Sequence, residues 1–546
     1  MKTLRRLIPL VCIAAAVQTS VAREAVATDF FDGIPTDFTL EDRDGNTLSQ
    51  DVTKYGFQQG DAWVAYFIES ENNMVAASTS WYASPGTSDD RMMLPTMRIG
   101  EGDALHWRAR CSDKYMPNAY RVMAECEGNE TVLFSTEGES PEWSFHHITL
   151  DEFAGKEITI AFIDCSTDAA LLYVDDIRLG HAERVRAEIT VPSHVTELQP
   201  FDLTGTIETD MAEAVKGNIT VVAQANGKEQ ALDLGDTTLQ PGSPIGFCLS
   251  EATEAGAVGE PLPVRIEVLL DGTVVAKCEK TIMPAANYAV CEELTGTWCA
   301  WCVKGIATFE HLKSLYPHSF IGIAIHNQDV MSKGVEDYES WIYSYGHASG
   351  YPFGFMMRNS VYGSDFDKFQ EAVEQINALP LTAFIETSVG EPTGNAYPLT
   401  TKVALSESMT DDRYQIAYIL VENDVFDPER PNSYTQKNAY AGGERGECGG
   451  YENMPEVIEN MHFQHVARTY VGEYKGFFAS LPMYMKRDTE YVSENIMEVP
   501  ASVLDMEKCE VVTLLIDKKT SCIVAADKLP LIGGRAGIQN PKTSAE

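Results

Sequence analysis

Short strand-like runs separated by turn-forming clusters dominate the first half of the sequence. The clusters are rich in Gly, Asp, Asn, Pro and Ser, and their spacing is typical of a β-sandwich or jelly roll. The runs within residues 24–182 are Ala62–Ile68, Leu105–Arg110, Tyr120–Ala124, Glu157–Ile163 and Leu171–Ile177. We therefore expect a jelly-roll domain over residues 23–182.

A second β-rich segment follows, in which the strand-like runs are spaced differently. Its strand-like runs are Ala187–Val191, Phe201–Ile207, Asn218–Gln224 and Val264–Leu270. About 100 residues with this pattern suit an immunoglobulin-like sandwich. We place that sandwich at residues 183–286.

The pattern then changes to a strand–helix–strand unit. Tyr288–Glu293 reads as a strand, and the apolar positions between Val303 and Tyr316 recur at helical spacing. Phe320–Ile325 is an almost unbroken apolar run, typical of a strand covered by helices on both faces. The expected boundaries are 287–380 for this α/β domain, 381–535 for a β-rich C-terminal domain and 536–546 for a flexible tail.

The sequence carries a large acidic excess. It has 81 Asp plus Glu against 41 Lys plus Arg, a formal net charge of −40 at pH 7. Phosphate backbones attract basic surfaces, so this charge argues against a nucleic-acid partner. Hydrophobic residues still make up 44% of the chain, which is enough for packed cores rather than a disordered acidic chain.

The N-terminus has the pattern of a secretory signal peptide over residues 1–22. Basic residues precede the apolar stretch Leu7–Val17, and Ser20-Val21-Ala22 supplies a small-residue cleavage pattern. No apolar stretch reaches the ~20 residues that a membrane-spanning helix needs. We expect an exported protein of the periplasm, outer membrane or cell surface, without a transmembrane span.

One pair of cysteines, Cys299 and Cys302, stands out by its spacing. The pair lies between the strand and helix patterns, at a helix N-terminus whose free N–H groups and dipole favour a thiolate. In a dithiol mechanism Cys299 is the nucleophile and Cys302 the resolving thiol. Glu293, at the end of the preceding strand, is expected to take protons from Cys302.

The run Trp298-Cys299-Ala300-Trp301-Cys302 resembles the active-site segment of thioredoxin-fold proteins, although thioredoxin has Gly-Pro between its cysteines. Gly350-Tyr351-Pro352-Phe353-Gly354 resembles the place where such folds carry a proline after a cis peptide bond. That bond lets the backbone pair with an extended partner segment. The resemblance implies these partner-contacting residues: Trp298, Trp301, Tyr351 and Pro352.

More closely, residues 288–535 resemble the outer-membrane-protein-twenty-eight-related family of Bacteroidetes. The matching runs are Glu292–Lys304, Phe320–Asn327, Tyr351–Arg358, Tyr440–Tyr451 and His465-Val466-Ala467-Arg468. The resemblance implies a thioredoxin-like domain followed by a β-rich domain in an exported or surface-associated protein. Its partners would be exported proteins that carry disulfides or thiols.

The N-terminal part resembles the cleaved-adhesin or choice-of-anchor jelly-roll domains of surface proteins from the same bacteria. The matching features include Gly33-Ile34-Pro35, Ser80-Trp81, Ser88-Asp89-Asp90 and Tyr173-Val174-Asp175-Asp176-Ile177. The resemblance implies a carbohydrate-binding-like jelly roll whose ligand is a glycan or a surface protein.

Two acidic stretches of the expected jelly roll bear on cation binding. Asp175, with Asp176 beside it, is the candidate ligand of a structural calcium, because hard cations bind clustered carboxylate and carbonyl oxygens. Asp42-Arg43-Asp44-Gly45-Asn46 looks like part of a calcium loop but lacks the later bidentate Glu. We interpret it as a strand-connecting turn, and we expect no other cofactor.

The sequence leaves two functions open. The first is dithiol/disulfide exchange on exported proteins through Cys299 and Cys302. The alternative is a non-enzymatic surface adhesion or ligand-binding protein, in which the thioredoxin-like domain is structural and the two cysteines form a static bridge.

Overall fold

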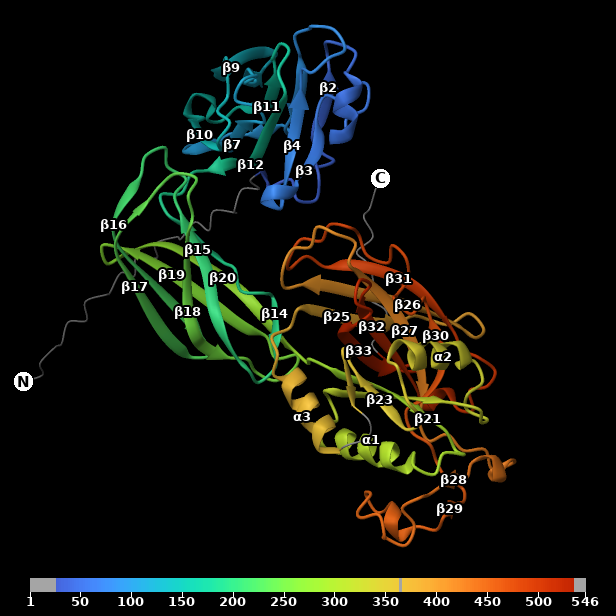
Figure 1. Cartoon of the computed structure of the whole chain (residues 1–546). Helices are drawn as coiled ribbons and strands as arrows, with labels where there is room; N and C mark the ends of the chain where they lie inside the picture. Colours follow the sequence, from blue (N-terminus) through green and yellow to red (C-terminus); the bar gives the residue numbers. More distant parts are fainter. Residues whose placement is uncertain (1–25, 363–365, 535–546) are drawn as a thin grey trace, which may run out of the picture. The chain divides into compact units, whose positions relative to one another are not determined.

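A computed structural model describes residues 26–362 and 366–534. Strands predominate in these residues (Figure 1). The chain divides into two compact units. The first unit holds residues up to 184 together with 210–213, and the second holds 185–209 and the residues from 214 onward. The expectation of a multidomain, mostly β protein is confirmed. The expected signal peptide and flexible tail lie outside the described residues.

The first unit is a sandwich of two antiparallel six-stranded sheets. One sheet has the order β10-β7-β12-β4-β3 with β1 beside β12, and the other has β2-β5-β11-β8-β9 with β6 beside β11. Trp107 and Phe162, one from each sheet, meet edge to face in the core with ring centroids 5.6 Å apart. The strands are β1 (Val26–Thr28), β2 (Thr39–Asp42), β3 (Val64–Ile68), β4 (Asn73–Thr79), β5 (Asp90–Met93), β6 (Met97–Arg98), β7 (Asp103–Cys111), β8 (Tyr120–Cys126), β9 (Asn129–Thr136), β10 (Ser144–Thr149), β11 (Glu157–Asp164) and β12 (Leu171–His181), with 3-10 turns at Gln50–Tyr55, Glu69–Glu71 and Asp151–Phe153.

The second unit begins with two further sheets, of three and five strands. Their orders are β13-β15-β18 and β14-β20-β19-β16-β17. Leu203 and Leu249 of the smaller sheet and Val221 and Ile266 of the larger one are all buried, so both sheets contribute to a core. The strands are β13 (Arg186–Ile189), β14 (His194–Thr196), β15 (Pro200–Glu208), β16 (Val215–Ala225), β17 (Lys228–Leu239), β18 (Ile245–Glu254), β19 (Leu262–Leu270) and β20 (Thr273–Ala285).

A strand–helix–strand arrangement follows, as expected. β21 and β22 run parallel, and α1 lies between them in the chain. Every residue of both strands is buried, which explains the continuous apolar run of β22. β23 pairs antiparallel with β21, and β24 pairs with β23. The elements are β21 (Ala289–Thr295), α1 (Val303–Leu315), β22 (Phe320–His326), α2 (Glu336–Tyr345), β23 (Phe353–Met356), β24 (Ser360–Tyr362) and α3 (Phe366–Asn377).

This sheet does not end where we expected a domain boundary, between residues 380 and 381. It continues through β22 into C-terminal strands, and the full order is β24-β23-β21-β22-β30-β27-β32-β33. The physical reason is that β22 has an edge whose backbone groups need partners, and β30 supplies them. Ile325 and Val512, from the two expected domains, belong to one hydrophobic core.

The remaining C-terminal strands form two small sheets, β25-β26-β31 and β28-β29. The strands after α3 are β25 (Ala383–Val389), β26 (Ala396–Leu405), β27 (Tyr414–Glu422), β28 (Gln436–Lys437), β29 (Val457–Ile458), β30 (Val466–Val471), β31 (Tyr491–Glu498), β32 (Cys509–Asp517) and β33 (Ile523–Pro530), with 3-10 turns at Pro431–Ser433, Tyr451–Asn453 and Met506–Lys508.

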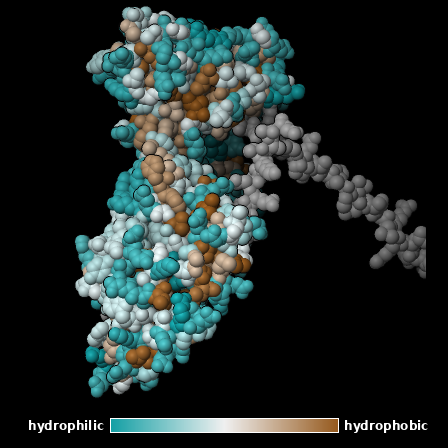
Figure 2. Space-filling view, turned by 90° about the vertical axis from the view of Figure 1, so that its right-hand side faces the viewer, coloured by the Kyte–Doolittle hydropathy of each residue, from teal (hydrophilic) through white to brown (hydrophobic). Residues whose placement is uncertain are grey.

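The surface is largely hydrophilic on the face that Figure 2 shows, and apolar residues gather there only in small patches. A hydrophilic surface keeps charged side chains hydrated, as a chain with a formal net charge of −40 requires. Within the described ranges, no helix has both the length and the apolar character needed to cross a membrane.

Candidate functional site

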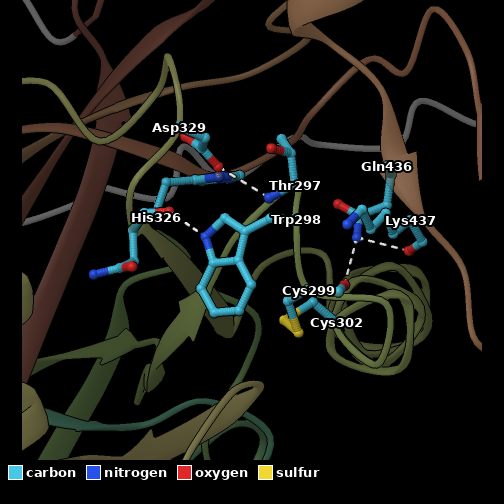
Figure 3. The surroundings of a disulfide bond; sticks show 9 residues. Thr297, Trp298, Cys299, Cys302, His326, Asp329, Gln436 and Lys437 are labelled. Atoms are coloured by element: carbon cyan, nitrogen blue, oxygen red, sulfur yellow. Dashed lines mark hydrogen bonds and ion pairs between the residues drawn. A yellow bond between two sulfur atoms is a disulfide. The ribbon is translucent and has the colours of Figure 1, made fainter.

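Cys299 and Cys302 form a disulfide between the end of β21 and the start of α1 (Figure 3). Cys302 is the residue immediately before α1, and its N–H donates to the Cys299 carbonyl at 3.2 Å. Cys299 keeps 5% of its surface exposed, whereas Cys302 has none. Both cysteines are therefore buried, and Cys299 is the less enclosed of the two.

Hydrogen bonds hold the turn before Cys299 in place. The indole Nε1 of Trp298 donates to the Asn327 carbonyl at 2.7 Å, and the Thr297 N–H donates to Asp329 at 3.0 Å (Figure 3). Burial opposes ionisation of Asp329, but the charge of His326 and a 2.7 Å hydrogen bond to that ring lower the pKa of Asp329. The sequence predicted no role for His326, the last residue of β22, or for Asp329, which follows this strand.

The Tyr351-Pro352 bond is cis, as the resemblance to thioredoxin-fold proteins implied. The Tyr351 ring meets the Trp298 ring edge to face, with centroids 5.3 Å apart. β23 starts one residue after Pro352 and pairs with β21 so that Gly354 lies opposite Glu293. Two of the four expected partner-contacting residues, Trp298 and Tyr351, are thus in contact, and Pro352 follows Tyr351 directly in the chain.

Trp301 does not share the contact between Trp298 and Tyr351 but contacts Tyr440 and Arg445. Trp301 is 47% exposed. Its ring meets the Tyr440 ring edge to face with centroids 6.0 Å apart, and the Arg445 guanidinium lies 4.5 Å from its centroid. The sequence pointed to Tyr440 only as the first residue of the matching run Tyr440–Tyr451. The two tryptophans of the motif therefore contact different parts of the chain.

Glu293 is buried beneath the first turns of α1. A Cβ atom placed on Gly305 would lie 1.7 Å from Glu293 Oε1, so only glycine leaves room for the carboxyl group at that helical position. Oε1 has no hydrogen-bond partner within the described residues, and burial raises the pKa of Glu293 to about 8. A small cavity beside it is also lined by Thr295, His326 and His465. At neutral pH this carboxyl group is mostly protonated.

The other cysteines of the described ranges are free thiols. Cys291, also on β21, is fully buried, and burial followed by the charges of Glu293 and Glu292 raises its pKa well above the usual range. Burial likewise raises the pKa of Cys448 to about 11. A buried thiol with a raised pKa is a poor nucleophile. Neither cysteine competes with Cys299.

Asp175 and the adjacent Asp176 both form ion pairs with Arg108. Asp175 is buried, lies 3.3 Å from the Arg108 guanidinium and accepts a hydrogen bond from Asn73 at 2.8 Å. Burial, and after it the charge of Asp176, raises its pKa to about 7. A calcium ion here would have to displace Arg108, so the expected metal ligand does not sit in a suitable donor set.

Three other carboxylates of the first unit do converge. Asp42, Asp44 and Asp90 each place an oxygen within 4.8 Å of the others. Asp90 is 3% exposed, and its Oδ1 has no hydrogen-bond partner in the described part of the chain. Burial raises the pKa of Asp90 to about 8, and the charges of Asp164, Asp44 and Asp42 add to the rise. The stretch that we interpreted as a simple turn contributes two of these carboxylates.

No protein-family model matches the sequence, and no curated protein matches it. Among solved structures, HBP35 of Porphyromonas gingivalis is similar with a TM-score of 0.34 and 11% identity, over 48% of this chain and 80% of that chain. The K3 cleaved adhesin domain of Lys-gingipain from the same organism is similar with a TM-score of 0.23 and 21% identity, over 29% of this chain and 97% of that one.

A third similar structure is TmCBM61, solved in complex with β-1,4-galactotriose. Its TM-score is 0.20 with 10% identity, over 28% of this chain and 93% of that chain. These scores are low, and they assign no family to the protein.

Proposed function

We propose that the second unit performs dithiol/disulfide exchange on exported proteins through Cys299 and Cys302. The observation that carries this proposal is the Cys299–Cys302 disulfide directly before α1, in which Cys299 keeps 5% of its surface exposed and Cys302 none. The parallel β21–α1–β22 unit, the antiparallel pair β23–β24 and the cis bond at Pro352 agree with a thioredoxin-like unit.

The proposed exchange begins with a partner thiolate that attacks the Cys299 sulfur. The bond between the two protein sulfurs breaks, and the Cys302 sulfur leaves with the electron pair and takes a proton. Glu293, protonated at neutral pH, is the proposed source of that proton. A second partner thiolate then attacks the mixed disulfide and releases Cys299 as a thiolate near the helix N-terminus. The partner becomes a disulfide and the protein a dithiol.

The test is a titration of the full-length protein with mixtures of reduced and oxidised glutathione. Alkylation and mass spectrometry of the peptide that contains Cys299 and Cys302 report the fraction of dithiol. We expect a reversible transition within the range of cellular glutathione potentials. A disulfide that stays closed at every ratio would refute dithiol exchange.

Glu293→Gln is expected to change how stability depends on pH. The folded-state pKa of about 8 lies above the ordinary 4.5. At pH values between these two, the folded protein therefore binds more protons than the unfolded chain. Stability must then fall as pH rises across this window, with a slope of up to about 1.4 kcal/mol per pH unit for one group. Glutamine does not titrate, so urea unfolding of the variant should lack this slope. Parallel curves for variant and wild type would contradict the assignment.

The second candidate function is surface adhesion or ligand binding through the first unit. Adhesin domains are among the similar structures, which agrees with surface adhesion and not with dithiol exchange. A double variant, Cys299→Ser with Cys302→Ser, separates the two functions. Adhesion alone would be favoured by two results together. The double variant would still bind a glycan or a surface protein, and the wild-type disulfide would never be reduced in the glutathione titration.

We also propose that Asp42, Asp44 and Asp90 hold a structural calcium ion. Carboxylate oxygens are the ligands that calcium prefers, and the unpaired Oδ1 of buried Asp90 is available to it. Bound calcium would replace the proton that Asp90 otherwise retains at neutral pH.

Calcium is accordingly expected to raise the thermal unfolding midpoint. Saturation at about 100 times the dissociation constant would stabilise the folded state by about 2.7 kcal/mol. Asp44→Asn should abolish most of this response, whereas Asp175→Asn should retain it. Differential scanning calorimetry with calcium and with a chelator gives the measurement, and equal midpoints in both would exclude the site.

A further inference from the structure

A segment far along the chain docks against the disulfide turn. The inserted segment, residues 423–465, lies between β27 and β30. The Lys437 N–H donates to the Thr297 carbonyl at 3.1 Å, and the Ala439 N–H donates to the Ala300 carbonyl at 2.8 Å. These two backbone hydrogen bonds bracket Cys299.

Between them, the side chain of Gln436 bonds to Cys299 itself. Its Nε2 donates to the Cys299 carbonyl at 2.8 Å and to the Lys437 carbonyl at 2.9 Å (Figure 3). Gln436 is fully buried, and its Oε1 has no partner within the described ranges. Both carbonyls require the NH₂ group on this side, so the amide orientation is fixed. Burying an unpaired amide oxygen is costly, and the two donated hydrogen bonds offset that cost.

The inserted segment is itself fixed to the helix that starts at Cys302. Cys448, Tyr451 and Ile458 form a small hydrophobic cluster with Val303 and Ala307 of α1. The Tyr451 hydroxyl also donates to Glu310 of α1 at 3.0 Å. Helix and segment therefore form one packed body, and the turn that carries Cys299 is held between them.

We propose that Gln436 is a positioning residue of the dithiol site, which holds the Cys299 turn in the geometry that closes the disulfide. This inference rests on the proposed dithiol exchange. When two glutathione molecules reduce the bond, the sulfurs separate, two thiols form and one glutathione disulfide is released. A turn held by Gln436 keeps the Cys299 thiol close to Cys302, so closing the disulfide costs less conformational entropy than it would in a loose turn.

The decisive variant is Gln436→Met, which preserves side-chain volume and removes both donated hydrogen bonds. Loss of a hydrogen bond that orders the turn should lower the equilibrium constant for disulfide formation against glutathione by about fivefold. Tyr451→Phe is the matched control, because it removes a hydrogen bond between the same segment and α1 that does not touch the cysteine turn. It should leave the constant unchanged.

The readout is the glutathione equilibrium of the full-length protein, measured on the peptide that contains Cys299 and Cys302. If Gln436→Met does not fold by circular dichroism, Gln436→Asn retains an amide that is too short to bridge both carbonyls, and the same shift is expected. An unchanged constant in the folded variant would overturn the role of Gln436 and leave dithiol exchange intact. A wild-type disulfide that never reduces would instead overturn the proposed exchange itself.

Discussion

Cys299→Ser is expected to abolish disulfide exchange, with a fall in insulin reduction on the order of a thousandfold, down to the rate of the added thiol alone. The reason is that Cys299 is the less buried cysteine of the pair, with 5% of its surface exposed, while Cys302 has none and is not expected to replace it. Turbidity of insulin in the presence of dithiothreitol measures the rate. Cys448→Ser, which removes a buried free thiol near α1, should behave as wild type.

Cys302→Ser should behave differently from Cys299→Ser. It leaves the attacking thiol intact but removes the resolving one, so mixed disulfides with partner proteins should accumulate. Mass spectrometry of adducts that dithiothreitol releases would identify them. If both variants reduce insulin at the wild-type rate, the disulfide is a static bridge and adhesion becomes the favoured function.

Arg358→Met is expected to destabilise the second unit by about 3–5 kcal/mol, because it leaves a buried carboxylate without its partner. The Arg358 guanidinium lies 2.6 Å from Glu292, and neither side chain has any exposed surface. Arg358 also donates to the Tyr474 carbonyl at 2.8 Å, and its guanidinium lies 4.9 Å from the Trp341 ring centroid. The pair links β21 to the turn after β23, and these two strands are neighbours in the sheet.

Urea unfolding monitored by tryptophan fluorescence tests this expectation. The double variant Glu292→Leu with Arg358→Met should recover much of the loss, because apolar side chains replace both charges and no buried charge remains unpaired. Arg265→Met is the control in the same unit. Its partner Glu279 is exposed, so the loss should stay below about 1 kcal/mol. A single variant as stable as this control would contradict the predicted cost of the buried pair.

The local parts of the fold were predictable from the sequence. Phe320–Ile325 was expected as a buried strand, and β22 is Phe320–His326. The helix expected from Val303 ends at Leu315, one residue before the expected end and shortly before Pro317. Hydrophobic periodicity is set by neighbouring residues, so it predicts which face of an element is buried without knowing its partner.

The candidate site was predictable only in its core. The cysteine spacing, the helix start and Pro352 are local features, and the structure agrees with each of them. Asp175 was not predictable in this way, because the ion pair with Arg108 depends on the pairing of β12 with β7. The acidic group around Asp90 likewise requires the pairing of β2 with β5.

The sequence by itself determined the β-rich character of the chain, the strand–helix–strand unit and the place of the cysteine pair before α1. The tertiary structure alone decided that Gln436, 137 residues from Cys299, bonds to its carbonyl. It also decided that one sheet crosses the expected boundary at residue 380. The physical reason is that both contacts are made to backbone groups, which are alike at every residue and leave no pattern in the sequence.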